Sequence, residues 1–306
     1  MFSCSSDEPE ISQEVLSFLD ELVDVMQQNS INKNDIDWNE FKESVYKQAD
    51  GAITIDDATS AISEALTLLC DRHSFFITSS QEFIGGAKRA DCTRLDLTED
   101  VPMNEEIGYV QVEAFSGASN EEMLEYALEI QNSIEEQDNE RIKGWIIDLR
   151  QNGGGNMFPM LAGVGSILGA GVAGYFINPD GLETPWGYSD GAAWTGQNTI
   201  LRLPNPYELI KPQPKVAVLS DNGIASSGEA LIISFIGRPN TRSFGEQTCG
   251  LSTANVAFPI NTSGTLILTV STMANRDRQI YGESVEPDVS LGPAESIQAA
   301  IDYLLE

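Results

Sequence analysis

The spacing of apolar residues changes along the chain, from a helical pattern at the start to short apolar runs further on. Residues 11–27 and 56–70 carry apolar side chains at intervals of three and four, which predicts two amphipathic helices. Between them, Asp37 and Glu40 have the spacing of a capping box and predict the start of another helix. Three short amphipathic helices in succession predict an N-terminal helical bundle domain over residues 1–76.

Beyond this bundle, apolar strands alternate with helices. Residues 107–115 alternate between apolar and polar side chains as a strand does, a helical stripe begins at Ser119, and residues 144–149 form a second apolar run. Residues 216–220 are almost continuously apolar, which is typical of a strand buried on both faces of a parallel sheet. These strand–helix–strand units predict an α/β fold for residues 77–306. Further strands are expected at 93–97, 241–246, 254–258 and 265–270, a closing helix at 294–305, and strands and loops in no definite order at 171–203.

The charge balance is strongly acidic. The chain has 306 residues, with 47 Asp and Glu against 17 Lys and Arg, which gives a formal net charge of −30. A surface of this charge repels nucleic acids and anionic membranes, and a nucleic acid is not an expected partner. It suits an exported protein or a salty environment, and it equally suits solubility alone. No apolar segment of the sequence is long enough to span a membrane.

Four cysteines are widely spaced along the chain, at Cys4, Cys70, Cys92 and Cys249. They form no Cys-x-x-Cys pair, so the sequence has no zinc or redox motif, and neither a metal nor a cofactor is expected. One disulfide is compatible with these positions, although free buried thiols are the favoured interpretation.

The first residues resemble the mature start of a bacterial lipoprotein, because Cys4 is followed by small polar and acidic residues. On this interpretation a signal peptide has been removed and Cys4 carries a lipid anchor. The protein would then reside in the bacterial periplasm or cell envelope rather than in the cytoplasm. A cysteine that stands at this position by chance is the alternative.

The chemistry that the chain offers is concentrated where apolar strands end. Ser226 follows the strand 216–220 and the turn Asp221–Gly223, and a helical pattern that includes Glu229 comes directly after it. Backbone N–H groups at a helix start are unpaired and lie at the positive end of the helix dipole, so they can bind an oxyanion. Ser226 is therefore either a nucleophile or simply the N-cap of the helix.

A triple glycine, Gly153 to Gly155, follows the strand 144–149 in the same way. It is not a Walker loop, because the Gly-Lys-Ser/Thr ending is missing, and it lacks the G-x-G-x-x-G spacing of a dinucleotide site. An anion-accepting backbone nest and a tight turn are the two interpretations left. Because the carboxyl ends of parallel strands meet at one edge, we expect this turn, Ser226 and the segment Gly245–Gly250 to converge there.

A nucleophilic serine needs a base. No lysine follows Ser226 in the sequence, and the last one, Lys215, lies in the strand before it. His73 is the one histidine of the chain, and it comes just after the last predicted helix of the bundle, where it can reach outward. His73 is therefore the candidate base, and a purely structural histidine is the alternative.

Four linked motifs stand in the chain, at Ile146–Gly155, Val216–Glu229, Gly245–Gly250 and Val285–Asp288. Their order and spacing resemble those of the tail-specific, or C-terminal processing, serine peptidase family, and the resemblance covers residues 56–290. It implies a crotonase-like α/β core. It also makes Ser226 the expected nucleophile.

The resemblance also bears on the base. The bacterial tail-processing branch carries its general-base lysine just after the last glycine of the third motif, but Leu251 stands there in this chain. The tricorn-core branch instead uses a histidine from the helical region before the core, and His73 stands in the matching place. In that branch a downstream glutamate orients the base. Glu283 and Glu286 are the candidates here, with Glu283 preferred.

Many relatives carry a peptide-binding PDZ domain before the core. Only about 35 residues separate His73 from the strand at Gly108, which is too few for such a domain. In this respect the chain also resembles the repeat module of interphotoreceptor retinoid-binding protein, which has the fold but binds apolar ligands.

The resemblance thus implies a serine peptidase that hydrolyses peptide bonds with a Ser226–His73–Glu283 site. The backbone N–H groups of Gly154 and Ser227 are expected to form the oxyanion hole. The substrate, a peptide or protein, is expected next to Gly153, Gly155 and Gly250.

Two alternatives are a non-catalytic binding module of the same fold, for an apolar ligand or a peptide, and a crotonase-type acyl-CoA enzyme. An acidic chain is a poor host for a polyphosphate cofactor, which counts against the acyl-CoA enzyme. The sequence leaves the oligomeric state open, and a homo-oligomer is compatible with it.

Overall fold

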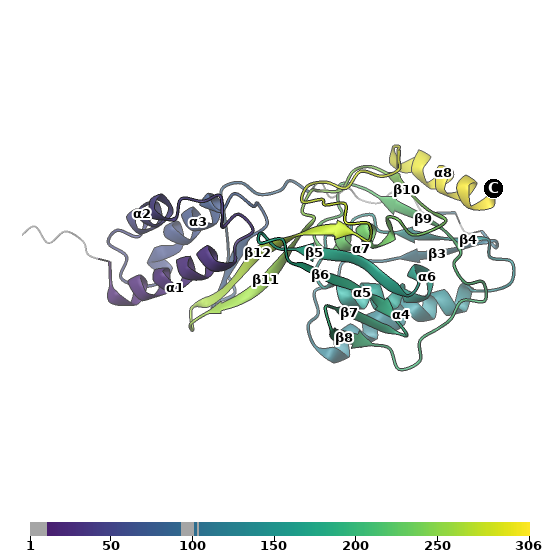
Figure 1. The fold of residues 1–306 in the computed structure, drawn as a ribbon, viewed down its shortest axis with the longest axis horizontal. Helices are drawn as coiled ribbons and strands as arrows, with labels where there is room; N and C mark the ends of the chain where they lie inside the picture. Colours follow the sequence, from purple (N-terminus) through teal and green to yellow (C-terminus); the bar gives the residue numbers. More distant parts are fainter. Residues whose placement is uncertain (1–10, 93–100, 103) are drawn as a thin grey trace, which may run out of the picture. The chain divides into compact units, whose positions relative to one another are not determined.

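The computed structural model describes residues 11–92, 101–102 and 104–306, and its chain forms two compact units (Figure 1). Among the described residues, the first unit contains 11–90 together with 178–181 and 254–271, and the second contains the others. The predicted domain boundary after residue 76 stays a prediction. The lipoprotein-like start at Cys4 and the strand expected at 93–97 lie outside the described residues.

The first unit contains the three helices that the sequence predicts. They are α1 (Gln13–Asn29), α2 (Trp38–Gln48) and α3 (Thr59–Leu68), the last preceded by the 3₁₀ turn η1 (Asp56–Ala58). Ser12 caps α1, because its hydroxyl accepts the N–H of Val15. Asp37 caps α2 by accepting the N–H groups of Asn39 and Glu40, so the cap expected at this position is confirmed.

Antiparallel strands complete the core of the first unit. They are β1 (Phe75–Thr78), β2 (Phe83–Gly85) and two longer strands that form a hairpin, β11 (Thr253–Ile260) and β12 (Gly264–Asn275). Phe76 from β1 and Leu266 and Leu268 from β12 are fully buried in the same apolar cluster as the inner faces of the helices. The helices therefore share their core with strands, and a helical bundle is only part of this unit.

The second unit is built on a parallel sheet, which confirms the α/β prediction. Its strands lie in the order β13-β10-β9-β4-β3, and every neighbouring pair is parallel. The bounds are β3 (Ile107–Gln111), β4 (Gly144–Asp148), β9 (Lys215–Ser220), β10 (Thr241–Gly245) and β13 (Val289–Ser290).

Alternate residues of the strands pack into two apolar layers, one on each face of the sheet. Trp145 and Ile147 of β4 belong to the cluster that includes α4 (Asn120–Gln137), α5 (Met157–Gly163) and α7 (Ser227–Phe235), whereas Ile146 faces α8 (Pro293–Leu305). Figure 1 shows α8 on one side of the sheet and α4 and α5 on the other. This two-sided burial explains why the strand sequences are continuously apolar. A short helix, α6 (Gly165–Leu168), follows α5.

Residues 171–203, whose order the sequence pattern does not reveal, form an antiparallel meander in the second unit. Its strands are β5 (Gly171–Ile177), β6 (Glu183–Ser189), β7 (Ala192–Thr195) and β8 (Asn198–Arg202). The meander is anchored by Trp186, which is fully buried and donates its indole N–H to the Ser234 hydroxyl of α7 (3.1 Å). Within the described residues, no helix is both long and apolar enough to cross a membrane.

A disulfide joins Cys92 to Cys249, with their Cα atoms 5.0 Å apart. The expectation that free buried thiols are favoured is therefore wrong for these two residues, because the fold brings together positions 157 residues apart. Cys70 is a free cysteine, and its side chain is exposed rather than buried.

Replacing Cys92 and Cys249 together by alanine is expected to lower the free energy of unfolding by about 2–5 kcal/mol, because the bridge closes a long loop in the unfolded chain. Urea denaturation of the double variant and of the parent measures this difference. Cys70→Ala is the matched control and should leave the midpoint unchanged. An unchanged midpoint in the double variant would show that the bridge does not stabilise the native chain.

Candidate active site

Three strand ends lie next to one another at the edge of the parallel sheet where the candidate site is expected. β4 pairs with β9 through Asp148 and Leu219, and β9 pairs with β10 through Ser220 and Gly245. The carboxyl ends of these strands therefore stand side by side, as the sequence predicts. Ligands approach α/β sheets at this edge.

A buried ion pair fixes the turn after β4. The Arg150 guanidinium donates to the Asp148 carboxylate at 2.6 Å, and the Tyr109 hydroxyl donates to the same group at 2.9 Å. Both charged side chains are buried, so each depends on the other for compensation. The pair holds the chain in place just before the triple glycine.

The turns after β4 and β9 are joined by hydrogen bonds that backbone N–H groups donate. The Gln151 N–H donates to the Asp221 carboxylate (3.0 Å), and the Ala225 N–H donates to the Asn152 carbonyl (3.0 Å). The two turns thus form one rigid element, although about 70 residues separate them in the sequence.

Gly154 lies directly against Ser226. It has φ +99°, and a Cβ atom placed on it would lie 2.9 Å from the Ser226 Cβ and 2.7 Å from the Ala225 carbonyl oxygen. Only glycine fits this approach. Next to it, the Ser227 hydroxyl donates to the Gly155 carbonyl (2.7 Å).

Some of the backbone N–H groups at this contact donate a hydrogen bond within the protein and others do not. The Gly154 N–H donates to the Asn152 side-chain oxygen at 3.0 Å, so that bond competes with the predicted binding of an oxyanion by Gly154. Among the described residues, the N–H groups of Gly155 and Ser227 have no hydrogen-bond acceptor. These two donors are available to a ligand.

Ser226 has a backbone conformation that is rare for a residue with a side chain, with φ 54° and ψ −115°. It is partly exposed, whereas the residues from Gly223 to Phe235 on both sides of it are buried. Ser226 and Glu229 have the arrangement of a capping box at the start of α7, in which the Ser226 N–H donates to the Glu229 carboxylate (2.9 Å). A helix cap alone does not explain the positive φ of Ser226, which is typical of a nucleophile held on a sharp turn between a strand and a helix.

Glu229, three residues on, is fully buried, and its carboxylate accepts four hydrogen bonds. One oxygen accepts the Thr248 hydroxyl (2.5 Å) and the Gly250 N–H (3.0 Å). The other accepts the N–H groups of Ser226 (2.9 Å) and Leu251 (2.7 Å). Burial raises the Glu229 pKa from 4.5 to about 7, although these donors oppose the shift.

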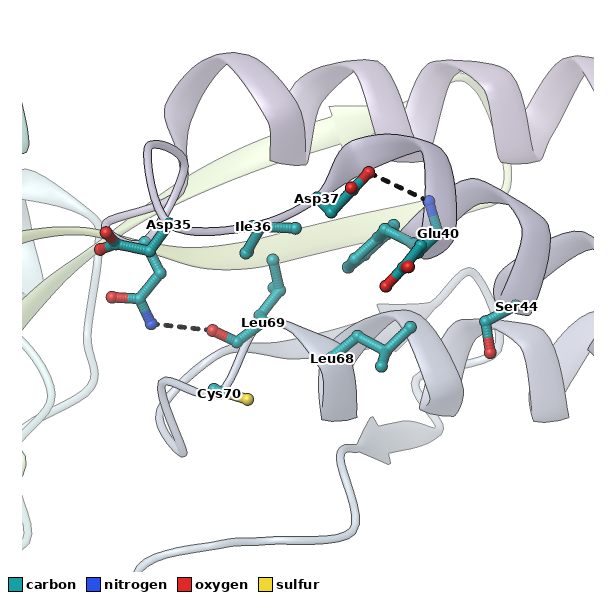
Figure 2. A pocket seen from close by; sticks show the side chains of 10 residues that line it. Asp35, Ile36, Asp37, Glu40, Ser44, Leu68, Leu69 and Cys70 are labelled. Carbon is teal, nitrogen blue, oxygen red and sulfur yellow. Dashed lines mark hydrogen bonds between the residues drawn. The ribbon is translucent and has the colours of Figure 1, made fainter.

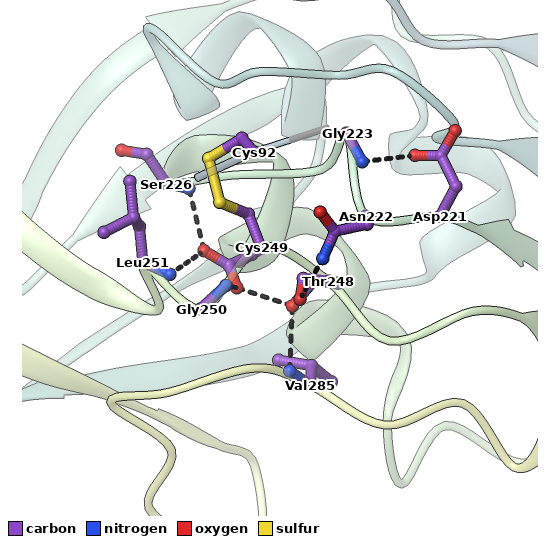
Figure 3. The surroundings of a disulfide bond; sticks show 11 residues. Cys92, Asp221, Asn222, Gly223, Ser226, Thr248, Cys249, Gly250, Leu251 and Val285 are labelled. Carbon is purple, nitrogen blue, oxygen red and sulfur yellow. Dashed lines mark hydrogen bonds between the residues drawn. A yellow bond between two sulfur atoms is a disulfide. The ribbon is translucent and has the colours of Figure 1, made fainter. Parts of the chain in front are cut away.

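The loop after β10 is held on its other side by Cys249. The Cys249 N–H donates to the Ile224 carbonyl (2.9 Å), and its sulfur is bonded to Cys92. Figure 3 shows this disulfide beside the hydrogen bonds that converge from Ser226 and the loop. The Thr248 hydroxyl also accepts the Val285 N–H (2.8 Å), which attaches the fourth sequence motif to the same group.

His73 belongs to the first unit, where polar contacts hold its segment. The Asp71 carboxylate accepts the N–H groups of His73 (2.9 Å) and Ser74 (2.8 Å), and Asn255 of β11 donates to the His73 carbonyl (3.2 Å). Burial lowers the His73 pKa from 6.5 to about 4, against the opposing effect of Asp71. The imidazole is therefore neutral at neutral pH, the form in which it can accept a proton.

The carboxylate predicted to orient His73 has the least structural support. Glu283 and Glu286 are both exposed, and the Glu283 carbonyl accepts a hydrogen bond from the Ser252 hydroxyl. Ser226 and Glu283 belong to the second unit and His73 to the first, so their assembly into one site stays a prediction. In the described part of the chain, no group of His, Cys, Asp and Glu side chains is placed to hold a metal ion.

Two residues of this region are missing from the set predicted from the sequence. Glu229 is marked only by its Ser-x-x-Glu spacing from Ser226, which is typical of a capping box. Asp71 is marked only by its closeness to His73. Neither signal reveals the tertiary contacts, because the donors to Glu229 at Thr248 and Leu251 come from a distant segment.

A strained serine between a parallel strand and a helix, beside a glycine turn, is the arrangement of α/β enzymes that use a serine nucleophile. The sequence matches peptidase family S41 over residues 106–291, more than half of the chain, so the protein belongs to this family of serine peptidases. The family acts on peptide bonds, and the protein is a hydrolase.

The chain is also similar to individual proteins. It is 24% identical over 273 residues to the nisin-resistance protein of Lactococcus lactis subsp. lactis, which covers 88% of this chain and 80% of that protein. The structure of a lipoprotein from Streptococcus agalactiae matches 97% of this chain and 98% of its own, with a TM-score of 0.76 and 21% identity.

The photosystem II D1 C-terminal processing protease matches 94% of this chain and 97% of its own, with a TM-score of 0.63 and 16% identity. At these identities the two solved structures show a shared fold. The crotonase-like core implied by the motifs is consistent with that fold.

Glu229→Gln is expected to change how stability depends on pH. Between pH 4.5 and about 7 the native chain holds one proton more than the unfolded chain, so the contribution of Glu229 to the free energy of unfolding falls as pH rises. The fall is on the order of 3 kcal/mol across this window. The stability difference between the parent and the Gln variant should therefore shrink by this order as pH rises.

Urea denaturation of both chains at several pH values measures this difference, and the comparison cancels the titration of other groups. His73 would contribute in the opposite direction, since its lowered pKa makes stability rise with pH between about 4 and 6.5. A difference that grows with pH would mean that the four donors outweigh burial at Glu229.

Proposed function

We propose that the protein hydrolyses peptide bonds with Ser226 as nucleophile and His73 as general base. The observation that carries the proposal is the strained, partly exposed Ser226, held against Gly154 with the Ser227 N–H free beside it. Family membership supplies the reaction class.

In the proposed reaction the Ser226 oxygen attacks the carbonyl carbon of the substrate while His73 takes the hydroxyl proton. The carbonyl π bond breaks and leaves the oxygen negatively charged. His73 then returns the proton to the leaving amine as the peptide C–N bond breaks, which forms an acyl-enzyme. Water, activated by His73 in the same way, releases the acid and restores Ser226.

We propose that the Ser227 N–H and a glycine N–H from residues 153–155 stabilise the oxyanion. The unengaged Gly155 N–H supports a role beside the predicted Gly154, whose N–H has Asn152 as a partner. Each such donor typically accounts for about 100- to 1,000-fold in turnover. Substrate backbone would then lie along Gly153, Gly155 and Gly250, positions without side chains.

Glu283, or Glu286, is proposed to orient His73 and to stabilise the imidazolium that forms during turnover. Their exposure is compatible with this role, since a substrate-bound site excludes water only when it closes. The parallel loss of activity in Glu283→Gln and His73→Ala would support Glu283 over Glu286.

The relatives suggest where the protein acts and on what. The Cys92–Cys249 disulfide supports an oxidising compartment, and the similarity to a streptococcal lipoprotein supports the proposed lipid anchor at Cys4. The nisin-resistance protein suggests a peptide substrate, and nisin itself is a suitable first probe.

Ser226→Ala is expected to reduce peptide hydrolysis by at least about 1,000-fold, and His73→Ala by about 100- to 10,000-fold, with native circular dichroism in both. A fluorophosphonate should label the parent and not Ser226→Ala. Ser166→Ala in α6 is the control for loss of a serine hydroxyl, because the Ser166 hydroxyl has no hydrogen-bond partner among the described residues. Retained turnover in Ser226→Ala would remove Ser226 from the mechanism.

The parent and all variants could instead bind a peptide without cleaving it or reacting with the phosphonate. That result would identify the protein as the non-catalytic binding module.

The pKa of His73 can be measured directly, because the chain has one histidine and hence one imidazole signal in an NMR titration. We expect a value near 4, well below 6.5, and a still lower value in Asp71→Asn, since Asp71 raises it. A pKa near 6.5 in the parent would show that the imidazole is not buried in solution.

A further inference from the structure

The first unit has a hollow of its own, between the start of α2 and the end of α3 (Figure 2). Its volume is about 520 Å³, within the range of sites that bind small molecules or short peptide segments. Apolar side chains line its inner part: Ile36, Phe41, Leu68 and Leu69. Phe41 and Leu69 belong to the buried core, so this surface is rigid.

The rim of the hollow is acidic. The carboxylates of Asp35, Asp37 and Glu40 stand around it, and no lysine or arginine is among the residues that line it. Asp37 is engaged as the cap of α2, but in the described residues Asp35 and Glu40 form no ion pair.

The basic residues nearest in sequence to this rim are paired elsewhere. Lys33 binds Asp180 at 2.6 Å, and Lys42 is within 3.5 Å of Asp24. Among the described residues, Asp35 and Glu40 thus have no basic partner, in a chain whose net charge is −30. A ligand that fits both parts of the hollow must carry positive charge next to apolar groups.

The hollow is also joined to the segment that carries the proposed base. Leu69 and Cys70 line it, and His73 follows three residues later, after Asp71, whose carboxylate holds the His73 N–H. Asn32, on the opposite wall, donates its side-chain N–H to the Leu69 carbonyl (2.8 Å). An occupant of the hollow thus lies against the chain that positions His73.

We propose that this hollow, lined by residues 32, 35–37, 40, 41, 44 and 68–70, is a docking site for a basic amphipathic segment of the peptide substrate. Apolar side chains of the segment pack on the partly exposed Ile36 and Leu68, and its lysine or arginine side chains pair with Asp35 and Glu40. This proposal rests on the proposed function, because the docked segment is a substrate only if the protein is a peptidase. It deepens that function by naming the class of substrate. Docking itself requires no catalysis.

The test uses the full chain carrying Ser226→Ala, so that binding is measured without cleavage. The probe is a 12-residue synthetic peptide of leucine and lysine, and its counterpart carries glutamate in place of lysine. Calorimetry should show binding of the lysine peptide that weakens in high salt, and no binding of the glutamate peptide. Cys70, exposed at the rim, should be protected from alkylation by the lysine peptide alone, as read by peptide-resolved mass spectrometry.

The double variant Asp35→Asn, Glu40→Gln should weaken binding of the lysine peptide about five- to tenfold. Glu43→Gln with Glu21→Gln is the matched control, since it removes the same charge from α2 and α1 outside the hollow and should leave binding unchanged. Equal weakening in both pairs, binding of the glutamate peptide, or absence of Cys70 protection would overturn the docking site.

With Ser226 intact, the rim variant should raise KM for a lysine-rich peptide about five- to tenfold and leave kcat unchanged. This result separates the two proposals. Hydrolysis with an unchanged KM in the rim variant would contradict the docking site and support the peptidase. Docking of the lysine peptide without any hydrolysis by the parent would support the docking site and contradict the peptidase.

Discussion

The carboxylate of Glu229 is the contact on which the geometry around Ser226 depends. Burying a charged group is costly unless its hydrogen-bonding capacity is filled, and here four donors fill it. One of them is the backbone of Ser226 itself, and the others come from the segment Thr248–Leu251. The strained backbone of Ser226 is thus held by an acceptor that also fixes the neighbouring loop, so neither can relax without leaving buried polar groups unpaired.

The site is further constrained by contacts that leave no room for adjustment. Gly154 approaches Ser226 so closely that any side chain would collide, and the Ser227 hydroxyl ties the same two turns together. On the opposite side, the Cys92–Cys249 bridge attaches the loop to another part of the chain. Donors for an oxyanion are effective when they need no reorganisation during the reaction, and this rigidity provides that condition.

How much of the structure the sequence could predict depends on how far apart in the chain the interacting residues are. The strand before Ser226 and the helix that begins at Ser119 depend on residues close in the chain, and both are confirmed. The Cys92–Cys249 pairing could not be predicted, because it depends on how segments 157 residues apart fold together. The acceptor role of Glu229 has the same cause. For residues 171–203, short antiparallel strands interrupted by glycine and proline leave no clear period, so only the fold reveals their order.

The distribution of charge follows from the same physical cause. Burial destabilises a charged group of either sign. It therefore raises the pKa of Glu229 and lowers that of His73, and both shifts favour the neutral form. Asp148 and Arg150 are buried as an ion pair, and the buried Arg238 guanidinium donates to backbone carbonyl oxygens. The excess of carboxylates that gives the net charge of −30 attracts cations over a distance of about 10 Å. An electrostatic field of this sign raises the local concentration of cations near the surface, which is the condition on which the proposed docking of a basic peptide depends.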